Sequence, residues 1–214
     1  MSVGCDRVDA GSAARVALVG RGPVLAEVDA HLADGRSVLL VGPSGSGKSA
    51  VIDAVGRPGL IVVDPFARIT TPRACAIRRA LDRGRLVAGA ATSVERREMG
   101  HVGRIFWRLE IVYVRPLPSH QIRSVFTRLL LAGDAAVPIS RTWLAEAVEV
   151  ANGLPGRAVS LASVVIARWR ERRQILPPRF ALAVAWQDAL FQTGAAPLPG
   201  SRKDMSHEPG PRRS

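Results

Sequence analysis

The clearest deficit in this 214-residue sequence is lysine, which occurs only twice, at Lys48 and Lys203. Arginine supplies the other basic side chains, and 30 basic against 18 acidic residues leave a net charge of +12. A chain this basic attracts polyanions such as nucleic acid. An excess of arginine and alanine is also typical of a GC-rich genome. The charge is therefore consistent both with a polyanionic partner and with codon composition. In the body of the chain the one lysine retained is inside a glycine-rich loop.

Cysteine is also scarce, since Cys5 and Cys75 are the only two and match no metal-binding or redox spacing. No signal peptide is recognisable, so we expect a reducing, cytoplasmic location. Apolar runs such as 38–41 and 60–63 are far shorter than the roughly 20 residues that cross a bilayer. Helix-turn-helix and zinc-finger spacings are missing too. Any contact with nucleic acid should therefore go to phosphates and be largely independent of base sequence, or else belong to a partner protein.

Short apolar runs alternate with helical segments through the first half of the chain, and only helical patterns follow. Such alternation predicts a parallel sheet with crossover helices. We expect an α/β core at 16–117 and a small all-helical lid at 118–192, between a flexible N-terminus (1–15) and a disordered basic tail (193–214). The expected strands are 37–41, 60–64, 86–91 and 109–114, and the expected helices are 24–32, 48–55, 72–82, 120–131, 140–151 and 158–173.

One motif carries recognisable chemistry: the run from Gly42 to Ser49 fits G-x-x-x-x-G-K-[ST] between an expected strand and an expected helix. Its glycines let backbone N–H groups turn towards phosphate oxygens, and the helix N-terminus adds a positive dipole. Lys48 should reach the β- and γ-phosphates, and the Ser49 hydroxyl should bind Mg²⁺. The motif predicts a three-layer P-loop NTPase core, with ATP favoured because no guanine-reading N-K-x-D motif is present. The expected cofactor-binding residues of this loop are Gly42, Pro43, Ser44, Gly45, Ser46, Gly47, Lys48, Ser49 and Ala50.

A carboxylate ends the second expected strand. Asp64 is placed to hold the Mg²⁺ shell, or alternatively to start a turn before Pro65. Many P-loop ATPases have a glutamate after this aspartate to activate the attacking water. Proline can neither polarise a water molecule nor accept its proton. The sequence therefore supports nucleotide binding better than fast hydrolysis. The stretch 48–64 is also short, so either a strand and helix have been lost or Asp64 ends a different strand.

Taken in order, these features resemble a compact AAA+ ATPase over residues 19–173, with some likeness to the STAND group. The segment Val19-Gly-Arg21 is similar to the one that covers the adenine in that family. Thr92, after the third strand, is similar to the sensor 1 residue that faces the γ-phosphate. Arg157, in the turn Gly153-Leu-Pro-Gly-Arg, is similar to the sensor 2 arginine of the lid. Arg104 lies where the family carries an arginine finger for the neighbouring subunit.

The resemblance implies an ATPase that forms an ATP-dependent homo-oligomer on nucleic acid and recruits or regulates a protein partner, as transposition helpers and helicase loaders do. Residues 73–108 contain nine arginines and three acidic residues, and this excess of positive charge is consistent with binding to nucleic acid. Two alternatives remain open: a P-loop kinase with Asp64 as the base, and a nucleotide-binding module that does not hydrolyse. The residues predicted to act on the phosphates are Lys48, Asp64, Thr92, Arg104 and Arg157, with Ser49 and Asp64 as the magnesium ligands.

Overall fold

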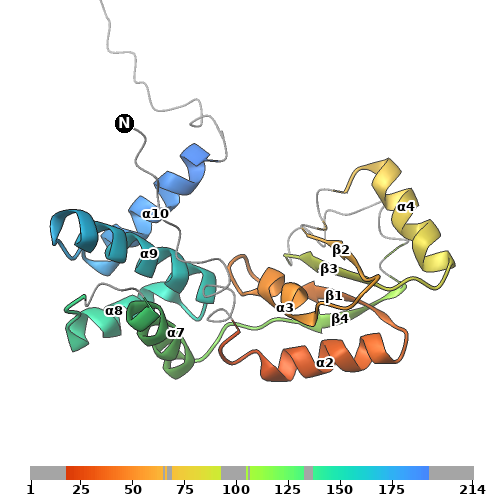
Figure 1. Ribbon diagram of the computed structural model, residues 1–214, viewed down its shortest axis with the longest axis horizontal. Helices are drawn as coiled ribbons and strands as arrows, with labels where there is room; N and C mark the ends of the chain where they lie inside the picture. Colours follow the sequence, from red (N-terminus) through yellow and green to blue (C-terminus); the bar gives the residue numbers. More distant parts are fainter. Residues whose placement is uncertain are drawn as a thin grey trace, which may run out of the picture.

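The computed structural model describes residues 18–64, 66, 69–92, 105, 107–132 and 137–192, with the backbone alone for 189–192. The predicted flexible N-terminus (1–15) and disordered tail (193–214) lie outside these ranges. Figure 1 shows an elongated molecule in which the sheet and its helices occupy one end and the later helices occupy the other.

Four parallel strands make the sheet, in the order β2-β3-β1-β4. The central strand β1 reads Ser-Val-Leu-Leu-Val and is buried along its whole length, as expected for a parallel strand covered on both faces. Its last residue, Val41, pairs with Ala91 of β3 and Tyr113 of β4, so these strands end at one level. The predicted parallel α/β fold is confirmed. The strands are β1 (Ser37–Val41), β2 (Ile61–Val63), β3 (Val87–Ala91) and β4 (Leu109–Tyr113).

Helices cover both faces of the sheet because side chains alternate along each strand. Val38 and Leu40 of β1 point into a cluster with helices α2 and α3, whereas Leu39 and Val41 point into a cluster with helix α4. The sheet is therefore the middle layer of three, as a P-loop NTPase core requires. The helices of this part are α2 (Gly22–Ala33), α3 (Lys48–Val55) and α4 (Thr71–Asp82).

In the described residues from 119 onwards, four helices, which we call the lid, pack on one another around a core of their own (Figure 1). Phe126 and Leu161 are fully buried there. Phe126 packs edge to face against Trp143, with the two ring centroids 6.3 Å apart. In the ranges that the structure covers, no helix is long and apolar enough to cross a membrane. The lid helices are α7 (Ser119–Ala132), α8 (Arg141–Ala151), α9 (Pro155–Arg172) and α10 (Pro178–Gln192).

Candidate functional site

The glycine loop joins the buried carboxyl end of β1 to the start of α3. Gly45 and Gly47 have φ values of 76° and 92°, a region that side chains other than glycine rarely adopt. Gly47 precedes the first residue of α3, and no side chain of the described residues caps this helix. The N–H groups of its first turn have no acceptor within the helix, so they can donate to an anion. The Lys48 ammonium donates to the carbonyls of Gly42 and Pro43, at 3.0 and 2.8 Å, and so curls back over the loop.

The first glycine of the loop is tightly enclosed. The Gly42 N–H donates to the Ala91 carbonyl at 3.2 Å, and a Cβ on Gly42 would lie 2.4 Å from the Val114 carbonyl oxygen. Backbone atoms crowd this position, so a side chain would force the loop away from the sheet. Glycine is required here to bring the loop close to the ends of three strands.

Arg21 lies beneath the loop rather than on its surface. Its side chain is almost completely buried, and its guanidinium donates to the carbonyls of Ser46 (2.6 Å) and Arg115 (2.7 Å). No carboxylate pairs with it among the described residues, and burial lowers the pKa of this arginine. Arg21 therefore links the loop to the connection between β4 and α7. That it also lines the adenine site stays a prediction.

The lid touches the glycine loop directly. The Gly156 N–H, in the first turn of α9, donates to the Gly45 carbonyl at 2.8 Å. A Cβ on Gly156 would lie 2.8 Å from Gly45 Cα, so the two backbones are in contact. Below this contact, the Leu117 N–H donates to the Gly153 carbonyl at 2.7 Å and fixes the turn before α9 to the chain entering α7. The N-termini of α3 and α9 thus meet at one loop.

The predicted sensor arginine is close to this loop through its backbone. The Arg157 nitrogen lies 3.8 Å from where a Cβ on Gly45 would stand. Its guanidinium points elsewhere, because it lies over the ring of Trp186 in α10, 5.5 Å from the ring centroid. The predicted role of Arg157 at the γ-phosphate stays a prediction, and the structure adds an aromatic contact that the sequence did not suggest.

The other predicted phosphate-sensing residues are at the same edge of the sheet. Thr92 directly follows β3, the neighbour of β1, and is half-buried. Asp64 follows β2, and its side chain is exposed. Because β3 separates β2 from β1, Asp64 is two strand spacings away from the loop strand, roughly 10 Å. Arg104 and Pro65 lie outside the described residues.

A metal ion at this site would depend on the nucleotide for part of its shell. Among the described residues, no three His, Cys, Asp or Glu side chains come together to hold a metal. Ser49 is the second residue of α3, directly after Lys48, and its side chain is exposed. Mg²⁺ is commonly held by one or two protein groups and by substrate phosphates, so this sparse donor set suits it. The ligand roles of Ser49 and Asp64 stay predictions.

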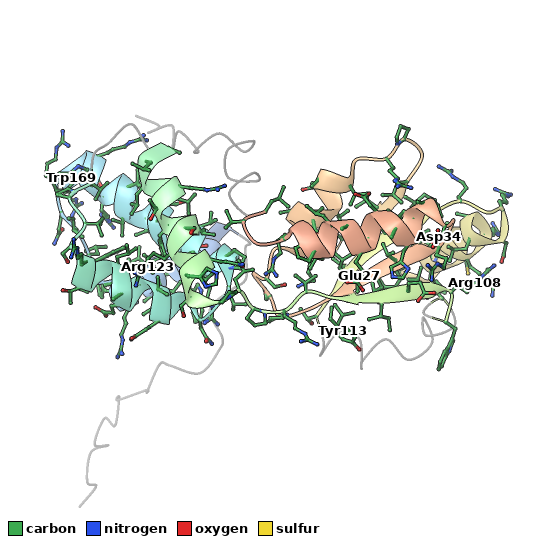
Figure 2. All side chains as sticks on the ribbon, turned by 90° about the horizontal axis from the view of Figure 1, so that it is seen from below. Glu27, Asp34, Arg108, Tyr113, Arg123 and Trp169 are labelled. Carbon is green, nitrogen blue, oxygen red and sulfur yellow. The ribbon has the colours of Figure 1, made fainter. Side chains whose placement is uncertain are left out.

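Two cavities lie at opposite edges of the sheet. One of about 300 Å³ adjoins the glycine loop, between Pro43, Tyr113 and Pro116. The other, of about 400 Å³, lies at the amino-terminal edge beside Arg36 and Arg108. Figure 2 shows Arg108 at the end of the molecule remote from the lid. Both arginines pair with acids there. The cavity beside the loop is lined by its first two residues, Gly42 and Pro43, and by the chain that leaves β4.

The fold can now be compared with solved structures. Yeast (S. cerevisiae) Hsp104, in an extended complex with casein, matches 82% of this chain with a TM-score of 0.61 and 18% identity. Thermotoga maritima RuvB, described as a Holliday junction branch migration motor, matches 79% with a TM-score of 0.51 and 14% identity. A point mutant of the same RuvB matches 79% with a TM-score of 0.55 and 13% identity. Hsp104 and RuvB are both AAA+ P-loop ATPases.

The chain has an AAA+ ATPase-like fold. It spans 42% of the Hsp104 chain and 68% of each of these two RuvB chains. No protein-family model and no curated protein matches the sequence. At these identities the likeness concerns the fold, and it confirms the resemblance that the order of motifs suggested.

Several contacts around the glycine loop were missed by the sequence reasoning. Gly156 carried a signal, because a glycine inside the first turn of a helix often allows another backbone to approach. Trp186 carried none, since its partner Arg157 is 29 positions earlier on another helix. The burial of Arg21 could not be foreseen either, because arginine is rarely buried without an acid.

Proposed function

We propose that this chain binds ATP with Mg²⁺ at the glycine loop and works as a nucleotide-dependent switch with slow hydrolysis. The observation that carries the proposal is the direct contact between the loop and the lid at Gly45 and Gly156. A ligand that occupies the loop lies within reach of both parts of the molecule. Its binding energy can therefore change how the lid is held.

The chain's own groups divide the work at the phosphates. Backbone N–H groups of the loop and of the first turn of α3 bind phosphate oxygens, and Lys48 leaves its two loop carbonyls to meet the β- and γ-phosphates. Ser49 and Asp64 are the groups that would hold Mg²⁺, which when bound neutralises developing charge on the phosphates. Thr92 and Arg157 would report the presence of the γ-phosphate.

A module that binds but does not hydrolyse ATP is the second candidate. Pro65 occupies the position after Asp64 where a water-activating carboxylate is expected, which favours this reading. A phosphotransfer role with Asp64 as the base is less well supported, because the solved structures with a similar fold include the ATPases Hsp104 and RuvB.

Nucleic acid is the partner we propose for the basic outer face of α4. Arg73, Arg78, Arg79 and Arg83 are exposed there, and none of them pairs with an acid among the described residues. Unpaired surface arginines attract phosphates without reading bases.

RuvB, which shares the fold, is described as a Holliday junction branch migration motor, and Hsp104 is seen with casein. We propose an ATP-dependent homo-oligomer with a protein partner, in which Arg104 reaches the neighbouring subunit.

The deciding experiment measures ATP binding and turnover by the full chain, with and without double-stranded DNA. Lys48→Ala should abolish binding, whereas Lys203→Ala, which removes the other lysine of the chain, should not. Turnover that rises with DNA and vanishes in Lys48→Ala would support the DNA-dependent switch. Tight binding without turnover in either condition would select the non-hydrolysing module. Equal binding by wild type and Lys48→Ala would refute the assignment of the site.

A further inference from the structure

The side chain of Arg157 is held by an aromatic ring on a different helix. Its guanidinium carbon lies 5.5 Å from the centroid of Trp186, within the range of a cation–π contact. Trp186 belongs to α10, which packs along α9 and so brings the ring to the first turn of that helix. Trp186 is 54% exposed, which is unusual for tryptophan when no ligand or partner covers it.

The backbone of Arg157, in contrast, is already at the glycine loop. The N–H of the preceding residue, Gly156, donates to Gly45, and the Arg157 nitrogen lies near Gly45 as well. A rotation of the side chain alone can therefore move the guanidinium from the indole towards a phosphate bound at the loop. The helix itself need not move.

We propose that Trp186 and the γ-phosphate are alternative partners for Arg157, so that Trp186 is a positioning residue that sets how strongly the lid distinguishes a triphosphate from a diphosphate. The inference rests on the proposed nucleotide site. A charge-assisted bond from arginine to phosphate is stronger than a cation–π contact at an exposed ring, so a bound triphosphate wins the guanidinium. A diphosphate offers no γ-phosphate and leaves Arg157 on the indole.

Two consequences can be measured. Binding of a triphosphate removes a cation from the face of Trp186, so the fluorescence of this indole changes, and a diphosphate leaves it as it was. The contact with Trp186 also opposes the move of Arg157, so its removal should tighten triphosphate binding by roughly 2- to 5-fold, the worth of an exposed cation–π contact. Diphosphate affinity should stay the same.

The test uses the full chain with Mg²⁺, ADP and the non-hydrolysable ATP analogue AMP-PNP. In wild type, AMP-PNP should change the tryptophan fluorescence and ADP should not. Trp186→Phe should lose this signal although Trp107, Trp143 and Trp169 remain. Figure 2 shows Trp169 at the end of the lid remote from the sheet, so a nucleotide bound at the glycine loop would not be expected to touch it.

Affinity gives the second readout, as the ratio of the ADP dissociation constant to that of AMP-PNP. Trp186→Leu should raise this ratio roughly 2- to 5-fold, and Trp186→Phe, which keeps a ring for the guanidinium, should stay near wild type. Arg157→Ala should lower the ratio, and Trp186→Leu should then have no further effect. The matched control is Phe180→Leu, which removes another exposed aromatic from α10, 59% exposed, that makes no cation–π contact with Arg157 among the described residues.

The outcomes separate this inference from the function on which it rests. Binding that depends on Lys48, together with a ratio that Trp186→Leu leaves unchanged, would overturn the role of Trp186 alone. An equal effect on both nucleotides, or an effect that persists beside Arg157→Ala, would show a merely structural role and also overturn it. No binding of either nucleotide by wild type would overturn the nucleotide site and this inference together.

Discussion

Replacing Gly156 with alanine tests whether the lid and the glycine loop act together. The added methyl carbon would lie 2.8 Å from Gly45 Cα and 3.0 Å from the Gly45 carbonyl oxygen. Both are backbone atoms, which cannot rotate aside as a flexible side chain does. Ordinary contact begins at 3.4 Å, so the two segments must separate by about 0.6 Å. The hydrogen bond from Gly156 to Gly45 stretches or breaks as a result.

The magnitudes separate an effect on the site from an effect on folding. A lost hydrogen bond costs about 1 kcal/mol. Alanine in place of glycine within a helix stabilises the folded state by up to about 1 kcal/mol, and Gly156 lies within α9. The free energy of unfolding should therefore change little. A nucleotide that bridges the loop and the lid would lose its contacts with the lid. We therefore expect AMP-PNP affinity to fall about 5-fold, equivalent to about 1 kcal/mol.

Calorimetric titration of AMP-PNP and urea unfolding of the same preparations measure the two quantities. Gly22→Ala is a matched control, because Gly22 also lies in the first turn of a helix but has nothing within 4 Å of the added methyl group. Unchanged affinity in Gly156→Ala would refute the coupling. An equal loss in Gly22→Ala would attribute the change to helix composition instead of the contact.

Three further predictions concern the residues around the loop. Arg21→Leu leaves the Ser46 and Arg115 carbonyls without their buried donor, so unfolding in urea should show roughly 2–4 kcal/mol of lost stability. Arg21→Lys should recover only part of that loss, because one ammonium cannot reproduce the guanidinium fork. Asp64→Asn should reduce the gain in AMP-PNP affinity on adding Mg²⁺ while leaving affinity in EDTA unchanged; an equal loss in both conditions would contradict a metal role. Replacing Arg78 and Arg79 together with alanine should weaken DNA binding for all sequences and lower the slope of log affinity against log salt by about 2; an unchanged slope would remove α4 from the nucleic-acid surface.

The sequence predicted the parts of this fold whose signals are local. Strand β1 has the predicted bounds, because an apolar run before a glycine loop leaves little choice. Strand β2 is shorter than predicted, at Ile61–Val63, and α9 starts three residues earlier than predicted, at Pro155. Proline without a free N–H is well suited to the first turn of a helix, and periodicity of apolar residues does not reveal that. The boundaries therefore depended on residues that the pattern had assigned to a turn.

The site was predictable only where one segment makes it. The loop from Gly42 to Ser49 could be named in full, since its residues are consecutive. Contacts between segments were not visible: the carbonyl partners of Arg21, the meeting of Gly45 with Gly156, and the ring beside Arg157 depend on how the lid folds back. The spacing of apolar residues along the chain predicts single helices and strands, but it does not predict which residues of two such elements come into contact.

The separate core of the lid has a consequence for how the molecule unfolds. Its buried residues, such as Phe126 and Leu161, form one cluster, while the residues of the sheet form two others that share no member with it. The lid cluster can melt without exposing the two sheet clusters, which share the strands between them, so the two ends of the chain are expected to open as distinct cooperative units. A nucleotide bound between them would make both units open together, because either opening would release it. Cooperativity of unfolding would then be a property that the ligand supplies to this chain.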